Sequence, residues 1–167
     1  MDKRVQPSKR MPEVSETERL TLADAHRHFA CAFNSEVWAL LSKTDRTDED
    51  EASIVSSAHA SLRHWAEIGT AVNRQRGEWL VSHVYALLGR PNGALHHGLR
   101  CLKLTQDHMD EMKDFDIAYA FEAMARAHAL AGDEKAAGEF DAKARTAGKR
   151  IKDEKNRTVF FEDLATR

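Results

Sequence analysis

The chain has 167 residues, and its 25 Lys and Arg against 27 Asp and Glu give a formal net charge of −2. This length predicts a single domain, and the balanced charge does not favour a dedicated nucleic-acid-binding protein, which is usually strongly basic. The two cysteines, Cys31 and Cys101, lack the spacing of a disulfide framework or a zinc knuckle. No window approaches the roughly 18 consecutive apolar residues of a membrane span, and the first residues lack the apolar core of a signal peptide. We therefore expect a cytoplasmic protein that does not enter membranes.

Residues 1–18 are predicted to form a disordered tail. They hold Pro7, Pro12 and four basic side chains but almost nothing apolar, so burial does not offset the entropy that is lost when a chain becomes ordered. The remaining residues, 19–167, are predicted to form one helical domain.

Four helices are predicted in the first half of this domain. Apolar residues recur at helical spacing over about 21–42, at Leu22, His26, Phe29, Phe33, Val37 and Leu40. Thr47 and Asp50 resemble a capping box that starts a second helix, which ends at Gly69. A third helix begins near Thr70 and ends at the turn that contains Gly89. A fourth helix begins at 91, where a proline is well placed for a first helical position.

Three further helices complete the chain. Asp114 or Asp116 is expected to cap a fifth helix, which ends before Gly132, and a sixth spans about 134–151. A short final helix, about 154–165, presents Val159, Phe160, Phe161 and Leu164 and is expected to cover the end of the core. No segment alternates apolar and polar residues as a strand does. The sequence therefore predicts an all-α fold of about seven helices.

Two segments of the chain match when their turn glycines, Gly89 and Gly132, are aligned. Tyr85 and His128 each lie four residues before the glycine, and small residues follow it at the fifth and twelfth positions in both segments. These small residues are Ala94, Cys101, Ala137 and Ala144. Small residues let two helices approach closely, and Tyr85 is expected to wedge between repeats. We interpret the segments as one helix-turn-helix unit used twice.

On these residues the chain resembles the tetratricopeptide-repeat (TPR) family over about 75–150. Ser82 and Ala125 supply the small residues of the family's close-packing position, whereas Glu78 or Phe121 stands where the family has a tryptophan. The two glycines are 43 residues apart, against the ~34 usual for a TPR. The chain is also similar to small bacterial TPR-like proteins without an assigned function. The resemblance implies a short right-handed solenoid of antiparallel helix pairs, with the first two helices as a degenerate first unit.

The resemblance also implies a non-catalytic adaptor that binds a protein or peptide partner on its concave helix face. The positions that line this face are Arg76, Trp79, His83, Tyr119, Glu122 and Arg126. An aromatic side chain flanked by charge pairs suits an extended peptide or a helix. In the alternative interpretation, Trp79 and Tyr119 only pack between helices and the charges face solvent. A homodimer that buries the end faces of the repeat array is a further alternative.

The nine histidines allow a different functional hypothesis. His26, His59 and His83 are expected near one another between the first three helices, and three neutral imidazoles with an open position suit zinc or another divalent metal. Glu78 would then serve as a base or an extra ligand. Such a site would resemble the DinB-like helical bundles, and the chain would be a metal-dependent enzyme or a metal sensor. No HExxH motif is present, and the adaptor hypothesis, which needs no cofactor, is preferred.

Other motifs give an enzyme no support. The chain lacks a G-x-S-x-G elbow, a P-loop and a dinucleotide-binding fingerprint. Cys31 and Cys101 occupy positions where buried, inert thiols are expected. The basic stretch at 145–157 also contains Asp153 and Glu154, so we interpret it as a solvated helix end rather than as a nucleic-acid site.

Overall fold

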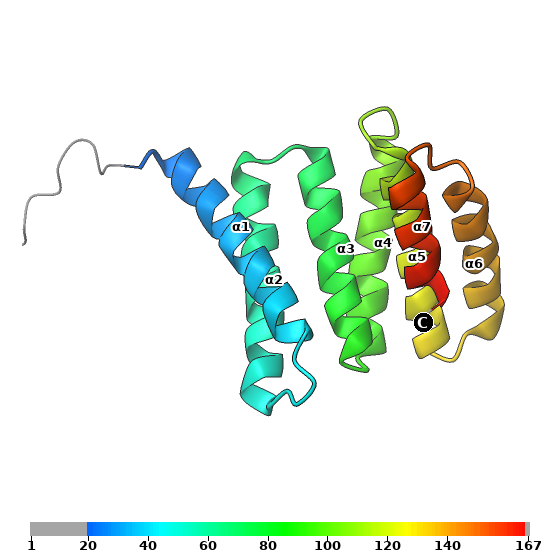
Figure 1. Ribbon diagram of the computed structural model, residues 1–167, viewed down its shortest axis with the longest axis horizontal. Coiled ribbons are helices and arrows are strands. Elements are labelled where there is room, and N and C mark those ends of the chain that lie inside the picture. The colour runs from blue at the N-terminus through cyan, green and yellow to red at the C-terminus, as the bar shows by residue number, and fades with distance from the viewer. Residues whose placement is uncertain (1–19, 166–167) are drawn as a thin grey trace, which may run out of the picture.

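The computed structural model describes residues 20–165, which form seven helices and no strand (Figure 1). The helices are α1 (Leu22–Leu41), α2 (Asp48–Ile68), α3 (Ala71–Leu87), α4 (Pro91–Asp107), α5 (Asp114–Leu130), α6 (Glu134–Gly148) and α7 (Glu154–Ala165). The all-α prediction is confirmed, and most boundaries fall within two residues of those expected. The tail predicted for residues 1–18 lies outside the described residues.

The helix starts follow local capping chemistry. Thr47 and Asp50 form the capping box expected at α2, and Pro91 takes the first helical position of α4. The start of α5 differs from the prediction, because Lys113 is the N-cap residue and the Asp116 carboxylate accepts a hydrogen bond from its backbone N–H at 3.0 Å. Asp116 therefore completes the first turn from inside the helix and is not itself the cap.

The two aligned glycines make the same turn. Gly89 has φ of 66° and Gly132 has φ of 79°, a left-handed conformation that favours glycine at the C-terminus of a helix. In both turns the following backbone N–H donates to the carbonyl five residues earlier, from Arg90 to Tyr85 and from Asp133 to His128. The match that the sequence predicted at these positions therefore extends to the backbone hydrogen bonds.

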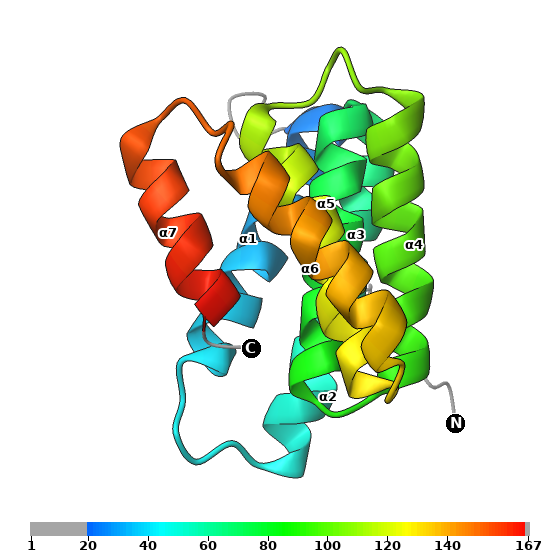
Figure 2. The ribbon, with the colours of Figure 1, turned by 90° about the vertical axis from the view of Figure 1, so that its right-hand side faces the viewer.

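Consecutive helices pack against each other along the chain. The most extensive contacts join α1 with α2, α3 with α4, and α5 with α6, and α3 also contacts α5. Helix α7 lies against α5 and α6 (Figure 2). This order of contacts brings α3 and α5 to the middle of the molecule.

The positions predicted to be small are buried between helices. Ala94, Cys101 and Ala144 are completely buried, and Ala137 is 8 % exposed. Ser82 is also buried, and its hydroxyl donates to the Ala94 carbonyl at 2.8 Å, which joins α3 to α4. Close helix packing at these positions is therefore confirmed.

The first core cluster fills the space between α1, α2 and α3. It contains Val37, Ile54, Ala58, Leu80, Val81 and Val84. Leu22 and Phe29, which the sequence placed on the same apolar stripe of α1 as Val37, are exposed instead. Only part of the stripe therefore reaches the core.

A second cluster lies at the other end of the chain and includes Phe160 and Leu164 of α7. Both side chains are buried, so α7 covers the end of the core as expected, although Val159 is exposed. Helix α6 ends at Gly148, three residues earlier than predicted, because the chain must turn there toward α7. Within residues 20–165 no helix combines the length and the apolar character needed to cross a membrane.

Candidate binding groove

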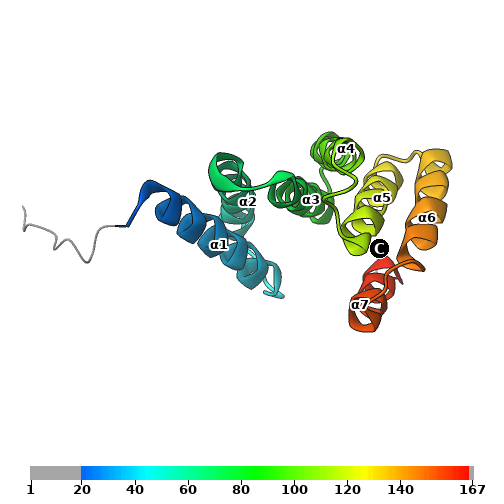
Figure 3. The ribbon, with the colours of Figure 1, turned by 90° about the horizontal axis from the view of Figure 1, so that it is seen from above.

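Helix α3 is flanked differently on its two sides. Viewed from above in Figure 3, α2 and α4 lie toward one side of α3, and α1 and α7 lie toward the other. On the second side, a cavity of about 340 Å³ is lined by residues of α1, α3, α5 and α7. We call this cavity the groove. Its lining includes three of the six residues predicted to bind a partner, Arg76, Trp79 and Tyr119.

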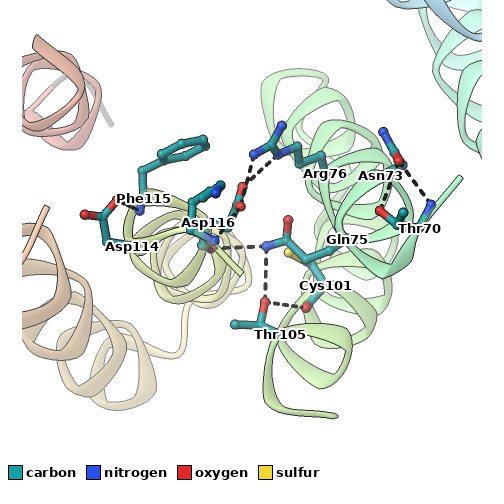
Figure 4. A network of polar contacts seen from close by, with 10 residues as sticks. Thr70, Asn73, Gln75, Arg76, Cys101, Thr105, Asp114, Phe115 and Asp116 are labelled. Carbon is teal, nitrogen blue, oxygen red and sulfur yellow. Dashed lines mark hydrogen bonds and ion pairs between the residues drawn. The ribbon is translucent and has the colours of Figure 1, made fainter. Parts of the chain in front are cut away.

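Arg76 is anchored at one end of the groove by a buried carboxylate. Its Nε and Nη2 atoms donate to the two oxygens of Asp116, at 2.8 and 3.1 Å, and its guanidinium lies 5.0 Å from the centre of the Phe115 ring (Figure 4). Asp116 is 2 % exposed, whereas the Arg76 side chain is 47 % exposed. The bidentate geometry therefore orients a guanidinium that is still accessible to a ligand.

Trp79 lies at the centre of an aromatic cluster. It stacks on Trp38 of α1 at 6.3 Å and on His83 at 5.0 Å between ring centres, and it meets the edge of Tyr119 at 5.3 Å. Trp38 is 44 % exposed. The cluster thus presents aromatic surface from three helices along the groove.

Tyr119 is held by α7. Its hydroxyl donates to Asp163 at 2.5 Å. Burial raises the pKa of Tyr119, and the nearby carboxylate of Asp163 raises it further, so the hydroxyl stays protonated and remains a donor. This contact fixes the α7 wall of the groove.

Glu122 lies beneath the surface and does not face a ligand. It is completely buried, and it accepts hydrogen bonds from Arg126 and, at 3.4 Å, from Trp79 Nε1. Arg126 also contacts the His83 ring. We therefore correct the prediction for Glu122, because full burial makes it a support for Trp79 and Arg126 and not a contact residue.

A second cavity is lined by Arg126. It has a volume of about 560 Å³, and its lining also includes Leu164 of α7 and the exposed side chains Leu87 and Leu130. Four of the six predicted residues therefore line one of these two cavities, whereas His83 and Glu122 line neither.

A buried polar network closes the base of the groove. The Gln75 amide nitrogen donates to Thr105 Oγ1 and to the Asp116 carbonyl, both at 3.1 Å, and Thr105 donates in turn to the Cys101 carbonyl (Figure 4). Because a carbonyl oxygen only accepts, these bonds fix the orientation of the amide. The network joins α3, α4 and α5 and holds the groove's helices in register.

Several groove residues were not found from the sequence. Trp38 and Asn34 come from α1, Phe115 and Asp116 from the start of α5, and Asp163 from α7. The repeat alignment covered only matched positions on α3 and α5. Trp38 directly follows Val37, a residue of the apolar stripe predicted for this helix. An aromatic residue at the edge of that stripe was the one sequence feature that could have pointed to Trp38 as a groove residue.

The three histidines of the metal hypothesis have different neighbours. His26 pairs with His64 at 2.9 Å, His59 contacts Tyr85 and His97, and His83 lies between Trp79 and Trp38. Within residues 20–165 no three His, Cys, Asp or Glu side chains are grouped so that they could hold a metal ion. The expected convergence of His26, His59 and His83 is therefore not found, because their helices direct them to separate interfaces.

The two cysteines differ in their surroundings. Cys101 is buried as expected, and burial raises the pKa of its thiol. Cys31 is exposed, which corrects the prediction for this residue.

Comparisons with known proteins add no relative. A scan against protein-family models, a search of curated proteins and a search of solved structures each found no match.

Proposed function

We propose that the chain is a non-catalytic adaptor of the TPR-like type, a short right-handed solenoid that binds a peptide segment of a partner protein in the groove. The solenoid is supported by the pairwise packing of consecutive helices and by the equivalent turns at Gly89 and Gly132. Stacked repeats of this kind create extended binding surfaces.

The observation that carries the proposal is the exposed aromatic surface beside an anchored arginine. Trp38 is 44 % exposed and lies against Trp79. Among residues 20–165, the hydrogen bonds of Arg76 to Asp116 use Nε and Nη2 and leave Nη1 to bind a ligand. Tryptophan and arginine dominate the energetics of protein interfaces. A peptide could place an apolar side chain on the exposed ring of Trp38 and a carbonyl or carboxylate oxygen on the Arg76 guanidinium, and would then contact both groups.

The test uses peptides selected from a random display library on the wild-type protein. Fluorescence anisotropy then measures the affinity of each selected peptide for the wild type, for Trp38→Ala and for Phe29→Ala. Phe29 is the matched control, because it lies on the same helix and is 45 % exposed but contacts His28, Phe33 and His64 and does not line the groove. Trp79 is less suitable, because it packs against two core clusters and its removal also affects folding.

We expect Trp38→Ala to weaken binding at least about tenfold, equivalent to about 1.4 kcal/mol, and Phe29→Ala to change it less than about twofold. The proposal is wrong if no selected peptide depends on Trp38, or if both variants weaken binding equally.

A further inference from the structure

A further cavity lies on the opposite side of α3 from the groove. It has a volume of about 500 Å³, and residues of α2, α3 and α4 line it. The His59 ring of α2 and the His97 ring of α4 meet at 5.2 Å between their centres, and α3 forms the floor between the two helices (Figure 3). The volume is in the range of small-molecule sites.

The cavity carries an excess of positive charge. Its cationic side chains are Arg63, Arg74, Arg100 and Lys103. Its carboxylates are Glu78 and Asp107, and Glu67 pairs with Arg63 from outside the cavity. Cations therefore outnumber carboxylates by four to three even when Glu67 is included. Arg74 makes no ion pair with any residue that the structure describes.

Arg100 is held by a buried carboxylate. Its Nε atom donates a hydrogen bond to Glu78 Oε1 at 2.7 Å, and the other oxygen of Glu78 accepts a hydrogen bond from His97 Nδ1 at 2.7 Å. Glu78 is 2 % exposed, whereas the side chain of Arg100 is 58 % exposed. Because only Nε is used within residues 20–165, the two Nη atoms of Arg100 are left to bind a ligand, and such a planar pair matches two oxygens of a phosphate.

Beside the charged residues, the cavity wall consists of His59 and three apolar side chains. Leu62 and Ala66 of α2 face the cavity from one side and Leu104 of α4 from the other. A free inorganic anion would leave this surface uncovered. A ligand with an apolar body attached to its anionic group would cover it and gain the free energy of burial.

We propose that this cavity binds a small organic phosphate, with the phosphate on Arg74 and Arg100 and the apolar body between Leu62 and Leu104. A phosphate monoester carries a charge between about −1.5 and −2 near pH 7. A ligand with this charge matches two arginines better than a ligand whose anionic group is a carboxylate with a single negative charge. The proposal is independent of peptide binding in the groove, because the two cavities share no lining residue.

Isothermal titration calorimetry with phenyl phosphate tests the proposal at 0.15 M salt. The test variant is Arg74→Glu, which breaks no ion pair of the described residues. The control is Lys135→Glu, an exposed residue of α6 whose reversal changes the net charge equally. At this salt concentration a distant charge is screened over about 8 Å, so the control isolates the local contact.

We expect saturable 1:1 binding of phenyl phosphate, weakened at least about tenfold in Arg74→Glu and less than about twofold in Lys135→Glu. Inorganic phosphate and benzoate should each bind more weakly than phenyl phosphate to the wild type, since each lacks one of the two recognised parts. Absence of saturable binding, equal losses in both variants, or inorganic phosphate or benzoate binding as tightly as phenyl phosphate would each overturn the proposal.

Discussion

At the scale of single residues, the carboxylates of Glu78, Asp116 and Glu122 are buried on α3 and α5, and each accepts a hydrogen bond from an arginine. Burying an unpaired charge is costly, so each arginine neutralises a carboxylate that the fold has removed from water. The same three arginines line the cavities of the molecule. The proposed ligand recognition therefore uses the same pairs that neutralise the buried carboxylates.

Arg76→Ala is expected to lower the free energy of unfolding by about 1–3 kcal/mol, because it leaves Asp116 buried without its bidentate partner. The expected loss is smaller than the full cost of breaking a buried ion pair, because the Arg76 side chain is half exposed. Lys103→Ala removes an exposed ion pair with Asp107 and should change the free energy of unfolding by less than about 0.5 kcal/mol. Urea unfolding of both variants measures the difference. Equal effects would contradict the role given to the buried carboxylate.

The two thiols should react at different rates. Cys31 is exposed, whereas Cys101 is buried and burial raises its pKa. We expect a thiol-specific reagent such as DTNB to modify one cysteine per native chain rapidly and the second only after unfolding in urea. Rapid modification of both thiols in the native protein would show that the interface between α3 and α4 around Cys101 opens.

His59 makes stability depend on pH. Burial lowers the pKa of His59 below its usual 6.5, and the nearby His97 lowers it further, against an opposing effect of Glu78. The folded protein therefore binds this proton less readily than the unfolded chain, so stability is full above about pH 6.5 and decreases as the pH falls below that value. Replacing His59 with Gln should reduce the loss of unfolding free energy between pH 7.5 and 5.5.

Glu78 acts in a lower pH range and does not obscure this test. Burial raises its pKa, but the hydrogen bonds from His97 and Arg100 outweigh burial and leave the pKa below its usual 4.5. Its contribution to stability is therefore present above about pH 4.5 and is lost only in more acidic solution. An identical pH dependence in wild type and His59→Gln over 7.5–5.5 would refute the assignment to His59.

At the scale of helices, α7 depends on a glycine at the end of α6. A Cβ atom at position 148 would lie 2.7 Å from Cδ1 of Phe160, whose side chain is completely buried and has no room to move. Gly138, on the same helix, has no contact within 4 Å of the Cβ position from the rest of the described structure, its own helix backbone and chain neighbours apart. Replacing each of the two glycines of α6 with alanine is therefore expected to change the free energy of unfolding in opposite directions.

Gly148→Ala should lower the free energy of unfolding by about 1–3 kcal/mol through overpacking against α7. Gly138→Ala should raise it by about 0.5–1 kcal/mol, because alanine is the better helix former at an exposed position. Urea denaturation curves give both values. Stabilisation by Gly148→Ala would mean that α7 does not pack on α6 as described.

The helices were largely predictable from the sequence because their signals are local. Capping residues and the left-handed glycines at 89 and 132 determine the ends of helices through contacts within a few residues. The end of α6 was predicted three residues too late, at 151 instead of Gly148. At Gly148 the helix lies close to Phe160 of α7, and a contact between separate helices leaves no signal in the local sequence pattern.

At the scale of the whole molecule, the candidate site was predictable only in part. The resemblance to the TPR family pointed to Arg76, Trp79 and Tyr119, which do line the groove. It gave no information on Trp38 or Asp163, since α1 and α7 lie outside the aligned repeats. It also could not distinguish exposed from buried charges, and so Glu122 was assigned to the surface.

The packing of the helices leaves cavities on two sides of α3. The groove combines aromatic side chains with an anchored arginine, and the opposite cavity combines an excess of arginine and lysine with apolar walls. A peptide in the groove and an organic phosphate opposite would therefore both contact α3. Of the two proposals, peptide binding in the groove defines the function.

Amide chemical-shift mapping by NMR locates the bound peptide, using the wild-type protein and a peptide selected from the display library. We expect the largest shifts on α1, α3, α5 and α7, around Trp38, Arg76, Trp79 and Tyr119. Shifts concentrated on α2 and α4, or spread evenly over all seven helices, would contradict peptide binding in the groove.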